Sequence, residues 1–418
     1  MKPLYHNKNL AVLCAITSIL LTSPAQAQDW TQWRGSGRDG RATSFTAPAD
    51  WKPKLLKAWS LEVGEGHSSP LIVNNKVYIQ AREGEEEVVR ALRLSDGGEI
   101  WKDKYSAPYE MNPAARGHGK GPKSTPVYAN GMLYTFSING VLTGYNAESG
   151  KVVWRKEFSK QFKTTAPDFG VAMSPIVDRD VVIAHVGGND DGALTAFEAR
   201  TGKVRWRWNG DGPSYASPVI TFIGGVKQVI TQTQHHCVGI SATSGAVLWQ
   251  EIFNTPYEQN SVSPIVIGDT VIFGGIGQPT FAVRVRKEGT AWKLDKLWSS
   301  RDAILYMNTP VVSGSTLYGM SQKRQGQLFS MNPITGAVLW TDSGRFGENA
   351  AILVGGGHLF ALSNTGNLYI YKKNGTNLQK IFQQQVADTE TWATPAISTR
   401  KMLIKDAKNL TLWNISQE

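Results

Sequence analysis

Thiols, charges and long apolar runs are all scarce in this sequence. Its 418 residues include two cysteines, which excludes a disulfide-stapled scaffold and a cysteine-rich zinc or iron–sulfur protein. Only 19% of the residues are charged, and no strand is followed by the Gly-Lys-Ser/Thr ending of a phosphate-binding loop. Beyond the N-terminal region, no stretch approaches the ~18 apolar residues of a membrane-spanning helix. A hydrophobic fraction of 41% is nevertheless ample for a folded core.

The N-terminal region has the pattern of a secretory leader. Lysines precede an apolar run, Leu10–Leu21, and the small residues Ala25 and Ala27 stand where a signal peptidase reads them. We therefore predict a signal peptide over residues 1–27 and a periplasmic or secreted mature chain. Cys14 lies inside the leader and follows a leucine, where a lipoprotein signal needs a small residue, so no lipid anchor is expected.

The rest of the chain is one repeat of about 45 residues. Each unit starts with Ser or Thr before a proline, continues through alternating strand-sized pieces and a Gly turn, and ends in Trp. The proline positions are Pro70, Pro126, Pro175, Pro218, Pro264, Pro310 and Pro395, with Ala351 in the equivalent place of the seventh unit. In five units a glycine precedes the tryptophan by four residues: Gly97 and Trp101, Gly150 and Trp154, Gly202 and Trp206, Gly245 and Trp249, and Gly336 and Trp340.

A period of this length with four strand-sized pieces predicts an all-β fold, an eight-bladed β-propeller of four-stranded antiparallel blades over residues 57–418. The last unit, from Thr394, ends before its Trp-bearing strand. The first Trp-bearing strand, Leu56–Leu61, has no unit of its own. Joining the two would close the ring and remove a free sheet edge. Residues 28–56 are then an N-terminal extension, which we expect to pack on the propeller.

The Pro-led strand, Gly turn and Trp at fixed spacing resemble the repeat of the pyrroloquinoline-quinone (PQQ) propellers. The segment Asp29–Gly40, with two tryptophans and two arginines, is similar to the opening of the PQQ-binding-like group. That superfamily contains quinoprotein alcohol dehydrogenases and the BamB subunit of the outer-membrane assembly machinery. The resemblance therefore implies the fold and leaves the activity open. We expect the repeated tryptophans to pack between blades, with each indole N–H satisfied locally.

One face of the ring should carry the function, because the loops entering the inner strands meet at the mouth of the central channel. The residue three before each proline position should line this mouth: His67, Lys123, Ala172, Tyr215, Ser261, Met307, Glu348 and Trp392. The longest entering loop, 102–123, carries Arg116, His118 and several glycines, which would suit an anionic ligand. For the adjacent histidines His235 and His236, strand alternation predicts opposite directions and no joint metal site.

Three functions are compatible with this mouth. The first is a binding or scaffold protein for an envelope protein partner or an anionic glycan, which the net charge of +10 favours. The second is a PQQ-dependent oxidoreductase, the one cofactor alternative, with Trp392 stacking the quinone and oxygens of Glu348, Asn349, Asn260 and Asn308 offered to Ca²⁺. The third is a polysaccharide lyase, with Lys123 or Arg116 as cation and His67 and Tyr215 as proton-transfer groups.

The first function is the one we predict, and whether the protein is an enzyme stays open. The catalytic candidates are His67, Tyr215, Lys123 and Glu348. The ligand-binding candidates are His67, Arg116, His118, Lys123, Tyr215, Asn260, Asn308, Glu348 and Trp392. No metal ligand set is predicted, no nucleic-acid or transmembrane partner is expected, and the chain is expected to be a monomer.

Overall fold

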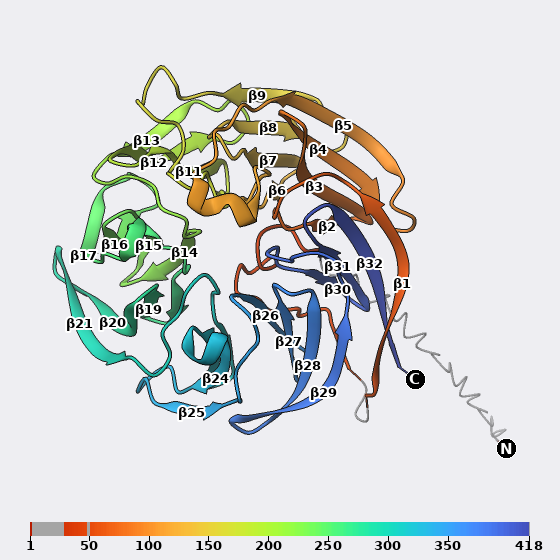
Figure 1. Cartoon of the computed structure of the whole chain (residues 1–418). Helices are drawn as coiled ribbons and strands as arrows, with labels where there is room; N and C mark the ends of the chain where they lie inside the picture. Colours follow the sequence, from red (N-terminus) through yellow and green to blue (C-terminus); the bar gives the residue numbers. More distant parts are fainter. Residues whose placement is uncertain (2–28, 48–50, 418) are drawn as a thin grey trace.

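The computed structural model describes residue 1, residues 29–47 and residues 51–417. The predicted signal peptide, residues 1–27, lies almost wholly outside this part of the chain. In the described residues the strands form eight four-stranded antiparallel sheets, which Figure 1 shows as blades around a central opening. The predicted eight-bladed β-propeller is therefore confirmed.

The first four blades follow one another along the chain. Blade 1 contains β2 (Leu71–Val73), β3 (Lys76–Glu83), β4 (Glu86–Arg93) and β5 (Glu99–Ser106). Blade 2 contains β6 (Val127–Ala129), β7 (Met132–Phe136), β8 (Leu142–Asn146) and β9 (Val152–Lys156). Blade 3 contains β10 (Ile176–Asp178), β11 (Val181–Gly188), β12 (Asp191–Glu198) and β13 (Val204–Trp208). Blade 4 contains β14 (Val219–Ile223), β15 (Val226–Gln232), β16 (His236–Ser241) and β17 (Val247–Ile252).

The remaining blades complete the ring. Blade 5 contains β18 (Ile265–Ile267), β19 (Thr270–Gly275), β20 (Gln278–Glu288) and β21 (Ala291–Ser300). Blade 6 contains β22 (Val311–Ser313), β23 (Thr316–Ser321), β24 (Gln327–Met331) and β25 (Val338–Thr341). Blade 7 contains β26 (Ala350–Gly355), β27 (His358–Ser363), β28 (Asn367–Asn374) and β29 (Asn377–Gln385). Blade 8 contains β30 (Ala396–Ser398), β31 (Lys401–Lys405), β32 (Asn409–Gln417) and β1 (Pro53–Glu62).

Blade 8 joins the two ends of the repeat region, as predicted. Strand β1 pairs antiparallel with β32, from Pro53 opposite Gln417 to Glu62 opposite Asn409. The strand begins at Pro53, a few residues earlier than the sequence pattern indicated. Three short 3-10 helices lie in the loops of the described chain: η1 (Pro113–His118), η2 (Pro256–Glu258) and η3 (Lys323–Gln325).

The repeated Trp and Gly residues lock neighbouring blades together. The Trp154 indole N–H of blade 2 donates to the Ala199 carbonyl of blade 3 over 2.9 Å, and Gly202 of blade 3 packs on the same ring. The same bond to the next blade recurs at Trp59, Trp101, Trp206 and Trp298, whereas Trp249 uses the Gln228 side chain of its own blade. These contacts agree with the packing role expected from the repeat.

The Ser or Thr before each proline builds a ring of hydroxyl groups around the channel. Six backbone N–H groups each donate to the hydroxyl of the next blade, along the series Thr394, Ser69, Thr125, Ser174, Ser217, Ser263 and Thr309, in which Thr309 only accepts. Ala350 has no hydroxyl and interrupts the ring in blade 7. Next to this interruption, the Arg34 guanidinium from the N-terminal segment donates to the Thr309 and Pro310 carbonyls.

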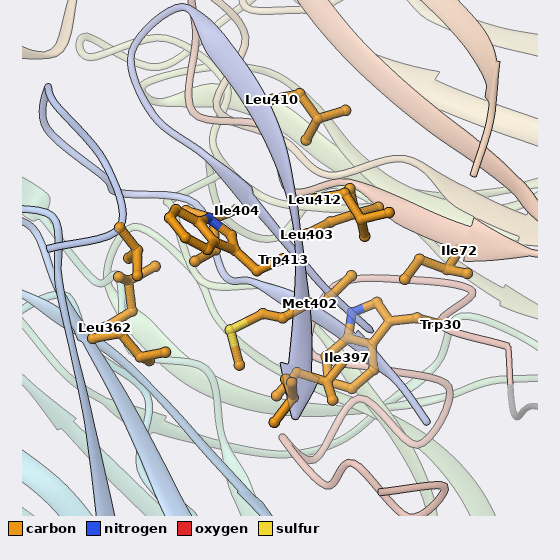
Figure 2. Packing of buried hydrophobic residues seen from close by; sticks show 14 of the residues in the cluster. Trp30, Ile72, Leu362, Ile397, Met402, Leu403, Ile404, Leu410, Leu412 and Trp413 are labelled. Carbon is orange, nitrogen blue, oxygen red and sulfur yellow. The ribbon is translucent and has the colours of Figure 1, made fainter. Parts of the chain in front are cut away.

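The N-terminal segment, residues 29–47, lies inside the ring. Its backbone forms hydrogen bonds with the channel-facing edges of inner strands, for example Trp30 with Ile72 in blade 1 and Ala42 with Val354 in blade 7. Figure 2 shows Trp30 and Ile72 beside buried side chains of the closing blade such as Met402. Because these edges would otherwise be unpaired, the segment covers them and fills the channel from one end.

Two buried arginines fix this segment across the ring. The Arg34 and Arg38 side chains are only 4% and 6% exposed. Arg38 donates to the Ser174 and Pro175 carbonyls of blade 3, while Arg34 holds blade 6. Burial lowers the pKa of Arg38 to about 9 and that of Arg34 to about 10. The two guanidinium groups lie 5.5 Å and 5.7 Å from the Trp33 ring centre, so they also set the position of Trp33.

Candidate functional site

The channel mouth holds a cavity of about 410 Å³. Its wall includes seven of the eight residues predicted for the mouth: His67, Lys123, Ala172, Tyr215, Ser261, Met307 and Trp392. Trp33 of the N-terminal segment, residues 29–47, also lines it, so this segment contributes an indole to the cavity wall. Further aromatic wall residues are Phe169, Tyr257 and Tyr306. Among the residues that the structure describes, no Asp or Glu lines the cavity.

Three nitrogen bases meet on one side of this cavity. Burial, with the charges of Lys405, His118 and Lys123, lowers the pKa of His67 to about 3. Burial and the charge of Lys123 also lower the pKa of His118. Both imidazoles are therefore neutral at pH 7, and the Nδ1 atom of His67 is buried without a hydrogen-bond partner. Burial lowers the pKa of Lys123 to about 8, so its ammonium is the main positive charge in the wall.

Phe169 ties Lys123 to Tyr215. The Lys123 ammonium donates to the Phe169 carbonyl over 2.7 Å, and the Phe169 N–H donates to the Tyr215 hydroxyl oxygen over 3.3 Å. The three residues come from the loops that enter blades 2, 3 and 4. Burial raises the pKa of Tyr215, so its hydroxyl keeps its proton at neutral pH. Because that hydroxyl accepts from Phe169, its own O–H is available to donate into the cavity.

Helix η1 forms part of the cavity wall and lies beside the central opening (Figure 1). Ala114, Ala115 and His118 of this helix line the cavity, and the His118 ring contacts the edge of Trp392 with ring centres 4.4 Å apart. The Trp392 indole N–H donates to Glu390. Arg116 of the same helix is exposed and is not among the lining residues.

A strained loop presents Tyr257 at the mouth. Tyr257 is 77% exposed, and both Tyr257 and Glu258 have positive φ angles, 59° and 55°. The Glu258 carboxylate holds the loop, because it accepts hydrogen bonds from Gln234 and Asn189 over 2.6 Å and 2.7 Å. Since such backbone costs ~1–3 kcal/mol per residue and persists only when neighbours enforce it, this loop is built to keep Tyr257 in place.

Next to this loop, two histidines share one carboxylate. The Nδ1 atoms of His235 and His236 each lie 2.9 Å from an Asp211 oxygen. Burial would raise the pKa of Asp211, but hydrogen bonds from Thr233, His236 and His235 outweigh it and lower that pKa. For His235, burial alone would lower the pKa, but the hydrogen bond and the negative charge of Asp211 outweigh burial and raise that pKa. The predicted opposite directions of the two histidines are therefore wrong.

Besides Arg116, three more predicted site residues lie outside the cavity lining. Asn260 is fully buried, where its amide donates to the Thr233, Gln234 and Phe253 carbonyls and its oxygen accepts from Thr255. Asn308 makes two hydrogen bonds with the backbone of Met320. Glu348 is exposed and does not line the cavity. Its neighbour Asn349 does, and the Asn349 side-chain oxygen is buried without a partner.

Several residues of the cavity wall were not predicted as site residues from the sequence. Trp33 had a signal, because it stands in the segment whose resemblance was noted. Tyr306 directly precedes the mouth residue Met307. Phe169 and Tyr257 lie in irregular loops, where no repeat position marks them.

The wall does not fit a calcium-held quinone. Hard cations such as Ca²⁺ require several oxygen ligands, usually including carboxylates. The described lining residues include no carboxylate, and the side-chain oxygens of Asn260 and Asn308 already accept hydrogen bonds from Thr255 and from the Met320 N–H. Among the described residues, no group of three His, Cys, Asp or Glu side chains could hold a metal ion. The calcium site considered from the sequence is therefore not assembled.

Comparison with known proteins places the chain in a family. The family model described as outer membrane protein assembly factor BamB matches residues 85–342. The chain belongs to the BamB family. It is 22% identical to the BamB of Yersinia pestis over 374 residues, which cover 84% of this chain and 86% of that protein.

Quinoproteins are similar over a shorter region. Subunit 1 of the methanol dehydrogenase of Methylorubrum extorquens is 31% identical over 179 residues, 38% of this chain, and the match spans only 26% of that protein.

Among solved structures, BamB from Moraxella catarrhalis covers 86% of this chain with a TM-score of 0.61 and 13% identity, and all of that chain is covered. A quinohemoprotein alcohol dehydrogenase from Pseudomonas putida HK5 covers 93% with a TM-score of 0.63 and 13% identity, and 80% of that chain is covered. These structural matches support the fold. No helix in the described part of the chain has the length and apolar character to cross a membrane.

Proposed function

We propose that this protein is a binding or scaffold protein of the bacterial envelope that receives a ligand, or a segment of a partner protein, in the channel-mouth cavity. The observation that carries the proposal is the convergence of seven loop residues from different blades on one cavity, whose described lining residues include no carboxylate. Membership of the BamB family supports the scaffold role and a periplasmic location. A cavity of about 410 Å³ is in the range of specific small-ligand sites.

The chemistry of the wall favours an occupant with a carboxylate and an apolar or aromatic body. Lys123 supplies a positive charge that no carboxylate of the described chain neutralises by an ion pair. Trp33, Trp392 and Tyr257 supply aromatic rings in the cavity wall. Such an occupant is either a small carboxylic acid or an acidic residue beside an aromatic residue on a partner protein.

A polysaccharide lyase is the second candidate, since His67, Lys123 and Tyr215 all lie in the cavity wall. The N-terminal segment restricts this hypothesis, because it lies across the ring and places Trp33 in the cavity wall, which leaves less room for the middle of a glycan chain. The oxidoreductase alternative has less support, because the wall offers no carboxylate as base or as ligand for Ca²⁺.

A site-specific photocrosslinking experiment tests the scaffold role. A crosslinking amino acid would replace Tyr257 at the mouth or, as a control, Phe222, which is 63% exposed on blade 4 and is not among the cavity-lining residues. We expect a defined crosslinked partner from position 257 in envelope preparations, its loss on Trp392→Ala, and no such product from position 222. Equal products from both positions, or none from 257, would contradict the proposal.

A spectroscopic assay separates the second candidate. Incubating the protein with acidic polysaccharides and recording ultraviolet absorbance detects the unsaturated uronate that a lyase produces. Growth of that absorbance, abolished by His67→Ala, would replace the scaffold role by the lyase. A flat trace removes the lyase and leaves the crosslinking result to decide.

A further inference from the structure

The Lys123 amine stands in an unusual position for a lysine. Its side chain lines the cavity, and the one hydrogen bond that its ammonium forms within the described residues goes to a neutral acceptor, the Phe169 carbonyl. In the described chain it forms no ion pair with a carboxylate. No negative charge of the described residues stabilises this buried ammonium, so Lys123 loses its proton more readily than an ordinary lysine. The resulting neutral amine has a free electron pair and can act as a nucleophile.

A comparison with Lys405 shows that a reactive lysine needs access to the cavity as well as a lowered pKa. Burial lowers the pKa of Lys405 to about 7, more than for Lys123. Its side chain is 1% exposed, however, and its ammonium donates to two carbonyls, of Gly66 and Asp406. It is not among the cavity-lining residues. Lys405 is therefore enclosed, whereas Lys123 faces a space that holds a small molecule.

A proton donor is fixed beside Lys123. Phe169 joins the two residues, because its carbonyl accepts from Lys123 and its N–H donates to the Tyr215 oxygen. The Tyr215 O–H is thereby turned away from Phe169 and towards other acceptors. His67 and His118, whose pKa values are lowered by burial and by the charge of Lys123, are neutral bases in the same wall.

We propose that Lys123 is an amine nucleophile that captures a small aldehyde or ketone in the channel-mouth cavity as a reversible imine. The Lys123 nitrogen forms a bond with the carbonyl carbon as the C=O double bond becomes single, Tyr215 gives its proton to the carbonyl oxygen, and the first amine proton returns to Tyr215 to give a neutral carbinolamine. Tyr215 then protonates the hydroxyl group, the C–O bond breaks to release water as the C=N bond forms, and the second amine proton restores Tyr215. Both hydrogens lost by the amine therefore end in the water. No oxidant, metal or further reactant is required.

The neutral amine fraction gives the expected selectivity. With a pKa of about 8, roughly one fifth of Lys123 is neutral at pH 7.4, compared with about 0.1% of a lysine with the ordinary pKa near 10.4. This difference of about 200-fold in reactive amine will be reduced by the narrower access to a cavity. Lys120, half-exposed in the same loop and paired with Glu85 at 3.7 Å, is the natural internal reference.

Reductive trapping tests the proposal on the full-length mature protein. Benzaldehyde is added with sodium cyanoborohydride, which reduces an imine to a stable secondary amine, and peptide mass spectrometry locates the benzyl group. We expect Lys123 to be labelled at least tenfold faster than Lys120, with no label on Lys405. Lys123→Arg should abolish this product, while the matched variant Lys120→Arg should leave it unchanged.

The role of Tyr215 has its own measurement. Tyr215→Phe should slow trapping at Lys123 without moving the label to another lysine, and circular dichroism should show the same melting temperature within a few degrees. Labelling of Lys123 no faster than of Lys120, or preferential labelling of Lys405, would overturn the proposal. Such a failure would leave the binding role intact, because a carboxylate ligand needs only the charge of Lys123 and is tested by crosslinking.

Discussion

The packing of Gly150 on Trp101 can be tested by one methyl group. Gly150 has a φ of +72°, and a Cβ atom there would lie 2.5 Å from Cδ2 of Trp101 in blade 1. Gly150→Ala therefore combines a left-handed backbone penalty of ~1 kcal/mol with an overpacking cost of ~1–3 kcal/mol. We expect a loss of about 3 kcal/mol in the free energy of unfolding, measured by urea denaturation followed by circular dichroism.

Gly131 offers a matched control one hairpin away. Its φ is +78°, but an added Cβ would meet no atom within 4 Å. Gly131→Ala should therefore lose only the backbone penalty of ~1 kcal/mol. Equal losses for the two variants would show that the repeated glycine serves the turn alone, and the account of blade-to-blade packing would be refuted.

Three further predictions concern buried ionisable groups and the N-terminal segment, residues 29–47. Burial raises the pKa of Glu87 to about 7, so this carboxyl stabilises the fold at low pH. That contribution falls by about 3 kcal/mol between pH 4.5 and 8, and Glu87→Gln should flatten this part of a stability profile measured by urea denaturation. Asp211→Asn should lower the raised pKa of His235, measured by NMR titration, and speed hydrogen exchange around Tyr257. Arg34→Met should expose the N-terminal segment to faster cleavage by chymotrypsin, because the segment loses its bonds to blade 6.

The fold was predictable because each blade repeats the same physical requirements. Pro, the Gly turn and Trp recur at one spacing, and the unpaired first and last strands leave ring closure as the way to remove both edges. The position of the mouth followed from the same repeat, since a residue at a fixed distance before each proline enters the channel from each blade. Only Glu348 of the eight lies outside the cavity lining.

The orientation of individual side chains was less predictable. Asn260 carries both donors and acceptors, and its loop has more backbone groups to satisfy than the repeat pattern reveals, so the side chain turns inward. For His235 and His236 the alternation rule failed, because β16 begins only at His236 and His235 belongs to the preceding turn. Alternation applies within a strand, and outside it the shared bond to Asp211 decides where both rings lie.

The N-terminal segment gives the central channel a wall that the eight blades alone do not provide. Eight similar blades alone would surround an opening lined by inner strand edges and hydroxyl groups, with little to distinguish one ligand from another. Arg34 and Arg38 hold residues 29–47 in that opening, and Trp33 contributes its indole to the cavity wall. The blades therefore supply the frame and the charge of Lys123, whereas the N-terminal segment supplies an aromatic part of the wall that the repeat alone does not provide.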